Sequence, residues 1–174
     1  MPASLVNIMT AVIVLENCKD PDNITITADK KLYEEFEEYE YRDDLRYGEI
    51  WDGDELTVTD YLYAMMLTSS CEASNILAYY FGNQNISAFV EMMNAKAKEI
   101  GAEHTVFANP HGLYDSKQVT TAKDMSLITQ YALTVPGFEE IATAEEYEVH
   151  PKSYVTVHED PWTCLLYTSD AADD

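Results

Sequence analysis

Basic residues are scarce in this 174-residue sequence. It contains 10 Lys plus Arg against 32 Asp plus Glu, which gives a formal net charge of -22 at pH 7. Nucleic acids and anionic membranes are bound mainly by basic surfaces, so this imbalance argues against either as a direct partner. We expect an acidic, solvated surface, which fits an extracellular or salt-tolerant protein.

Cysteine and long apolar runs are scarce as well. The three cysteines, Cys18, Cys71 and Cys164, do not make a disulfide framework. No apolar run approaches the ~20 residues that a membrane span needs, and no signal peptide is present. The hydrophobic content of 47% is nevertheless enough for one domain with a real core. We therefore predict a single, mostly helical domain without internal repeats.

The apolar periodicity and the helix-start residues predict where the elements lie. Thr57 and Thr121 are each followed three residues later by an aspartate, which is typical of a capped helix start. Gly101 stands where a helix would end. We expect helices over residues 4–15, 57–67, 73–81, 87–100, 121–132 and 138–142, and strands over 24–27 and 146–150. The acidic, tyrosine-rich stretch 31–49 has no clean period, and we expect it on the surface.

Ser4 lies at the N-terminal end of the first predicted helix, where it is a good N-cap residue. Free backbone N–H groups and the helix dipole favour negative charge at this end, and Asn7 lies one turn further on the same face. This pattern indicates a serine that could be activated for nucleophilic attack. An ordinary capped amphipathic helix is the alternative.

Two polar segments interrupt the apolar pattern further along the chain. Residues 68–72 (Thr-Ser-Ser-Cys-Glu) form a short polar segment between two apolar helices, and residues 107–113 (Phe-Ala-Asn-Pro-His-Gly-Leu) form a loop. Cys71 by itself fits a buried structural thiol, since no histidine is near it in sequence. The four histidines have no metal-binding spacing. His111, inside the loop, fits a structural role better than contact with a site.

The motifs, taken in order, resemble the D-alanyl-D-alanine carboxypeptidases, the low-molecular-mass penicillin-binding proteins. The resemblance rests on P-A-S at 2–4, I-M-T-A at 8–11, S-x-C at 69–71, N-P-H-G-L at 109–113 and T-T-A-K-D at 120–124. It implies an α/β (α+β) β-lactamase/transpeptidase-like fold. This chain would hold mostly the helical part, with most of the antiparallel sheet missing.

The resemblance also implies a domain organisation. Residues 1–163 would be a partial catalytic domain of a longer protein, truncated at both ends. Residues 164–174 resemble a translated sequencing adapter, and the alternative is a natural acidic tail.

The resemblance implies a serine acyl-enzyme mechanism. Ser4 would attack the penultimate D-alanine carbonyl of a peptidoglycan stem peptide that ends in D-Ala-D-Ala, and β-lactams would acylate the same serine. Ser69 would relay a proton to the leaving group, and Cys71 stands where the family has the asparagine that holds the lysine and the substrate amide. No metal or organic cofactor is implied. The expected location is outside the cytoplasmic membrane, with membrane contact only through segments that are not in this chain.

Two departures from the family pattern bear on activity. Asn7 replaces the family's lysine, and a neutral amide has no accessible pKa for general-base work. The third family motif, K-T-G, is absent. Asn7 is either a genuine change or a single-base sequence error. The alternatives to a carboxypeptidase are a catalytically inactive peptidoglycan or β-lactam binder and a β-lactamase. Glu72 fits a deacylating glutamate poorly, because the carboxypeptidases carry an acid there too.

Overall fold

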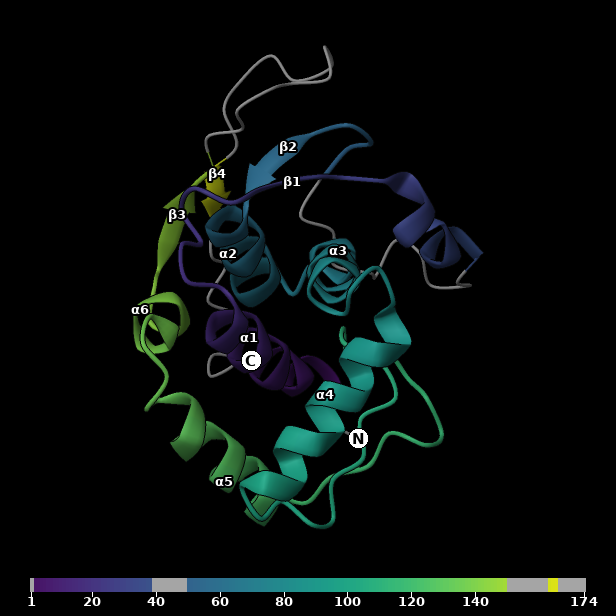
Figure 1. Cartoon of the computed structure of the whole chain (residues 1–174), viewed down its shortest axis with the longest axis vertical. Coiled ribbons are helices and arrows are strands. Elements are labelled where there is room, and N and C mark those ends of the chain that lie inside the picture. The colour runs from purple at the N-terminus through teal and green to yellow at the C-terminus, as the bar shows by residue number, and fades with distance from the viewer. Residues whose placement is uncertain (1, 39–49, 150–162, 166–174) are drawn as a thin grey trace, which may run out of the picture.

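The structure, a computed structural model, describes residues 2–38, 50–149 and 163–165 (Figure 1). Its α-helices are α1 (Val6–Asn17), α2 (Val58–Thr68), α3 (Cys71–Phe81), α4 (Ile86–Glu99), α5 (Ala122–Ala132) and α6 (Phe138–Ala142). Three 3-10 helices are η1 (Ala3–Leu5), η2 (Lys30–Leu32) and η3 (Glu34–Glu38). The strands form two antiparallel pairs, β1 (Thr25–Thr27) with β2 (Glu55–Thr57) and β3 (Glu146–Glu148) with β4 (Thr163–Leu165).

Helix α1 lies at the centre of the molecule. Eight of its twelve residues are buried, and it packs against helices α2 to α6, which surround it in Figure 1. A helix that is apolar on nearly every side is stable only when other elements cover all of those sides. The two polar side chains buried in α1 are Asn7 and Thr10. Both therefore need hydrogen-bond partners from neighbouring elements.

Most predicted helices are confirmed, together with their start signals. The Thr57 hydroxyl accepts a hydrogen bond from the Asp60 N–H, and the Asp60 carboxylate accepts one from the Thr57 N–H, which completes a capping box for α2. Thr121 caps α5 through the Asp124 N–H. The Asp124 carboxylate, however, accepts hydrogen bonds from the backbone of His104 and the hydroxyl of Thr105. It therefore anchors the preceding loop.

The predicted N-cap role of Ser4 is wrong. The chain enters α1 through the 3-10 turn Ala3–Leu5, closed by a 3.2 Å hydrogen bond from the Leu5 N–H to the Pro2 carbonyl. Ser4 lies inside this turn, and no side chain caps either η1 or α1. A second difference is at α3, which begins at Cys71, two residues before the predicted start, because the Ser70 hydroxyl caps it. Strand β2 (Glu55–Thr57) was not predicted.

Some predictions fall wholly or partly on residues that the structure does not describe. Of the stretch predicted to run over the surface, residues 39–49 lie outside the described residues. Of the predicted tail, residues 166–174 lie outside them too, and Cys164 and Leu165 belong to β4. Cys18 and Cys71 are free and buried. Among the described helices, none is long and apolar enough to cross a membrane.

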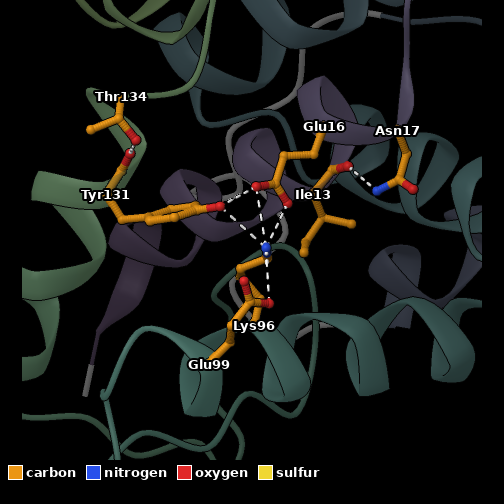
Figure 2. Close-up of polar contacts among 7 residues, drawn as sticks. All are labelled: Ile13, Glu16, Asn17, Lys96, Glu99, Tyr131 and Thr134. Atoms are coloured by element: carbon orange, nitrogen blue, oxygen red, sulfur yellow. Dashed lines mark hydrogen bonds and ion pairs between the residues drawn. The ribbon is translucent and has the colours of Figure 1, made fainter.

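A polar cluster fixes the C-terminal end of α1 (Figure 2). Lys96 of α4 lies 3.0 Å from the Glu16 carboxylate and 3.1 Å from that of Glu99, and it donates a hydrogen bond to the Tyr131 hydroxyl at 3.2 Å. The Tyr131 hydroxyl in turn donates to Glu16. Partial burial lowers the pKa of Lys96, but the hydrogen bonds to Glu16, Glu99 and Tyr131 outweigh it and raise that pKa. Three helices thus meet at one charged lysine.

Candidate active site

The backbone around Ser4 is held by a loop about one hundred residues away in sequence. The Thr10 hydroxyl of α1 donates a 2.7 Å hydrogen bond to the Pro110 carbonyl. Gly112 of the same loop has a φ of +84°, and a Cβ atom built on it would lie 2.2 Å from the Ala3 carbonyl oxygen and 3.2 Å from the Ser4 nitrogen. Only glycine lets two backbones approach so closely in this conformation. The loop therefore fixes the position of the exposed Ser4.

The residue before the serine has an unusual conformation. Ala3 has a φ of +48°, in the left-handed region that residues with a Cβ rarely adopt. Such conformations persist only where the surrounding structure enforces them, and they concentrate at functional sites. Here the contact with Gly112 supplies that constraint. The turn that presents Ser4 to solvent is therefore imposed by tertiary packing.

Asn7 connects the two halves of the predicted site. Its side chain is 3% exposed, and its Nδ2 donates a 3.2 Å hydrogen bond to the Met65 carbonyl in α2. This bond ties the helix that follows Ser4 to the helix that ends just before Ser69. The Asn7 oxygen Oδ1 has no hydrogen-bond partner among the described residues, so it accepts no hydrogen bond from the Ser4 hydroxyl. A buried carbonyl without a donor is costly, by about 1–3 kcal/mol.

Ser69 and Cys71 lie together at the junction between α2 and α3. Ser69 has a φ of +58° and ends α2, and the Cys71 sulfur donates a weak 3.9 Å hydrogen bond to the Ser69 carbonyl. Burial, reinforced by the charges of Glu72 and Glu35, raises the pKa of the Cys71 thiol to about 12. The thiol is therefore protonated at neutral pH and is no nucleophile. It is a small, weakly polar side chain at the start of α3.

His111 is buried and neutral. Its Nδ1 accepts a hydrogen bond from the Leu113 N–H at 3.2 Å, and its ring meets that of Phe36 edge-on at 5.0 Å. Burial lowers the pKa of His111 from 6.5 to about 4. At physiological pH it is not a cation, and its contacts stabilise the loop that carries Gly112.

Lys96 does not stand in for the basic residue that Asn7 replaces. Lys96 contacts Glu16, twelve residues beyond Ser4, and a helix rises about 1.5 Å per residue, which places that contact about 18 Å from the serine. Within the described ranges, no group of His, Cys, Asp or Glu is arranged to hold a metal ion.

Gly112 and Thr10 hold the serine turn in place, a role that the sequence alone does not predict. Their roles depend on contacts between residues about one hundred positions apart, which no local pattern reveals. Both residues lie in motif segments of the sequence, I-M-T-A at 8–11 and N-P-H-G-L at 109–113, but the motifs indicated no contact between them and the serine turn.

Comparison with known proteins gives matches along most of the chain. The sequence profile of a family described as D-alanyl-D-alanine carboxypeptidase matches residues 1–167. The D-alanyl-D-alanine carboxypeptidase DacF of Bacillus subtilis is 29% identical over 149 residues, which are 84% of this chain and 36% of that protein. A D-alanyl-D-alanine carboxypeptidase of a Streptomyces species is 25% identical over 149 residues, 83% of this chain and 50% of that protein.

Solved structures agree with the sequence comparisons. The crystal structure of the D-alanyl-D-alanine carboxypeptidase DacD from Francisella tularensis superimposes with a TM-score of 0.73 at 28% identity, covering 87% of this chain and 37% of that one. The chain therefore spans between about a third and a half of the length of these relatives.

Proposed function

Because this chain belongs to the D-alanyl-D-alanine carboxypeptidase family, we propose that it is the helical part of a serine-type D-Ala-D-Ala carboxypeptidase. The expected fold class is confirmed, since the solved neighbours are DD-peptidases and the described chain is a mostly helical part of such a fold. The observation that carries the proposal is the packing of Gly112 against Ala3 and Ser4, which holds an exposed serine in an enforced turn.

In the proposed reaction, the Ser4 hydroxyl oxygen attacks the carbonyl carbon of the penultimate D-alanine of a stem peptide. The peptide C–N bond breaks, the terminal D-alanine leaves with the serine's proton on its amine, and Ser4 carries an ester. Water then hydrolyses the ester and restores the hydroxyl. Ser69, at the α2–α3 junction, is proposed as the proton relay, and β-lactams would acylate the same oxygen. The proposed location is outside the cytoplasmic membrane.

We propose that Asn7 limits the rate of this reaction. A side-chain amide cannot accept the serine's proton, and Asn7 already donates to Met65. Loss of one member of a cooperating catalytic set can cost about 10⁴–10⁶ in rate. The burial of Asn7 and the protonated state of Cys71 favour a second candidate, a peptidoglycan or β-lactam binder without turnover. We propose residues 1–163 as the partial catalytic domain and residues 164–174 as a tail outside it.

Fluorescent-penicillin labelling tests the proposal. We expect little or no covalent label on the chain itself. The Asn7→Lys substitution should restore labelling when the sheet strands of the Bacillus subtilis relative are joined to the chain, and Ser4→Ala should abolish it again. Circular dichroism shows whether each protein is folded. A folded Asn7→Lys chimera that takes up no label would refute the assignment of Ser4 as the nucleophile.

A further inference from the structure

A groove of about 590 Å³ lies between strand β1 and helix α3. In Figure 1, β1 runs between its partner strand β2 and α3, so the edge of β1 that does not face β2 faces the helix. Residues 25–29 line the strand side of the groove, and Ile76, Tyr79 and Tyr80 of α3 line the helix side. None of the candidate catalytic residues lines this groove, so the proposed peptidase reaction does not account for it.

The free edge of β1 presents backbone hydrogen-bonding groups to the groove. In an antiparallel pair, every second residue exchanges its backbone hydrogen bonds with the partner strand, and the residues between point their groups the other way. The Ala28 N–H donates to the Asp54 carbonyl at 2.8 Å, so residues 24, 26 and 28 face β2 in the observed register. The N–H and C=O groups of Thr25 and Thr27 therefore point away from β2, and they have no other partner among the described residues.

The helix side of the groove is apolar and partly open. Tyr80 is 46% exposed and Tyr79 is half-buried, whereas Ile26 and Ile76 are buried. Side chains that lie opposite each other in paired strands point to the same face of the sheet. A residue opposite Ile26 on an added strand would therefore point to the side on which Ile26 is buried, and an apolar side chain would match it there.

Two carboxylates give one end of the groove a negative charge. Asp29 and Asp52 are exposed, and no lysine or arginine is among the lining residues. The Oδ1 of Asp29 accepts the Lys31 backbone N–H at 3.0 Å, and the Oδ1 of Asp52 accepts the Lys30 backbone N–H at 2.8 Å. These bonds hold both carboxylates in place, and neither Oδ2 accepts a hydrogen bond from the described residues. A cationic side chain is therefore favoured at this end.

We propose that this groove binds a basic, extended segment of another polypeptide, which adds to β1 as an antiparallel strand. Main-chain hydrogen bonds to Thr25 and Thr27 supply the affinity, and the side chains of the segment supply the specificity. In antiparallel register, an apolar residue lies opposite Ile26, and a lysine or arginine lies opposite Asp29, three positions earlier in the segment. A second copy of this chain fits less well, because two chains of formal net charge -22 repel each other.

The test is calorimetric titration of the full chain with the peptide acetyl-Ser-Lys-Val-Thr-Leu-Thr-Ser-amide. In the proposed register its leucine lies opposite Ile26, its lysine opposite Asp29, and its two threonines opposite Thr25 and Thr27. Methylating the backbone nitrogens of the two threonines removes the donors to β1 and should weaken binding about tenfold. Methylating those of the valine and leucine is the matched control and should leave most of the affinity, because these N–H groups point away from β1.

The charge preference is tested separately. Acetylating the lysine side chain of the peptide should weaken binding about threefold to fivefold, and the difference should shrink at high salt. Asp29→Asn should remove most of this preference, and its amide oxygen still accepts the Lys31 N–H. Glu103→Gln is the matched control, since it removes one exposed charge that does not line the groove, and it should leave the preference unchanged.

Thr27→Pro tests the edge from the protein side. It removes an N–H that β2 does not use, which an edge strand tolerates, and should weaken binding about tenfold. Circular dichroism shows whether this variant is folded, and the comparison of methylated peptides does not depend on it. No measurable binding of the unmethylated peptide, equal affinities of the two methylated peptides, or equal effects of Asp29→Asn and Glu103→Gln would overturn the proposal. A dimer in sedimentation velocity that Thr27→Pro abolishes would assign the edge to a second copy and overturn it as well.

Discussion

Replacing Gly112 by alanine should damage both stability and the serine site, and the structure allows the two causes to be separated. The added Cβ would lie 2.2 Å from the Ala3 carbonyl oxygen and 2.7 Å from its carbonyl carbon. Ordinary non-bonded contacts are near 3.5 Å, so the two backbones must move apart by about 1 Å. The left-handed φ of +84° adds its own penalty of about 1–2 kcal/mol for a residue with a Cβ.

Gly101 provides the matched control. Its φ of +83° is nearly the same, but a Cβ built there meets nothing within 4 Å. Gly101→Ala should therefore cost only the conformational penalty. Gly112→Ala should cost that penalty plus about 1–3 kcal/mol for the forced displacement. Urea unfolding followed by circular dichroism measures both free energies of unfolding on the same chain.

The serine should respond to the same displacement. A shift of about 1 Å at a reacting group can cost about 10²-fold in rate. In the Asn7→Lys chimera, we expect Gly112→Ala to slow penicillin labelling by about that factor and Gly101→Ala to leave it unchanged. If the two alanine variants lost equal stability and labelled equally fast, the reasoning would be refuted. The contact between Gly112 and the serine turn would then contribute neither to the free energy of unfolding nor to the labelling rate.

Two further predictions concern charged groups. Burial lowers the pKa of His111 from 6.5 to about 4, so the unfolded chain binds more protons between these values and stability should fall as the pH drops from 6.5 towards 4, by up to about 3 kcal/mol. His111→Phe should flatten this dependence in urea unfolding at pH 7, 5.5 and 4.5, and an unchanged slope would contradict the assignment. Lys96→Met should destabilise the fold by about 1–2 kcal/mol at low salt, because Glu16 and Glu99 lose their common cation. The exposed Lys98, on the same helix, is the control, and equal losses for Lys98→Met would show that the cluster adds nothing.

Local patterns in the sequence were sufficient for most helices and for the order of the motifs. Thr57 with Asp60 and Thr121 marked helix starts correctly, because a cap depends on residues only three positions apart. The start of α1 could not be predicted in this way. Ser4 looks like a cap, but the left-handed Ala3 and the contact with Gly112 turn the segment into a 3-10 helix. In the candidate site, too, local motifs could be predicted and contacts between distant segments could not.

The motifs predict four catalytic residues, and their catalytic roles stay predictions: Ser4, Asn7, Ser69 and Cys71. The hydrogen bond from Asn7 to Met65, and the one from Thr10 to Pro110 that holds the serine turn, depend on the packing of segments distant in sequence. Burial also changed the chemistry expected of individual side chains. Neither the raised pKa of Cys71 nor the lowered pKa of His111 can be inferred from residue type alone.

The central position of α1 has a consequence for how fast the chain folds. Helical proteins usually fold quickly because their contacts are local, but α1 is completed by partners far along the chain. The hydrogen bond from Thr10 to Pro110 spans 100 residues, and that between Tyr131 and Glu16 spans 115. Closing such a loop costs about 2 kcal/mol more entropy than closing one of ten residues. We therefore expect folding in milliseconds to seconds, with the serine turn among the last parts to form.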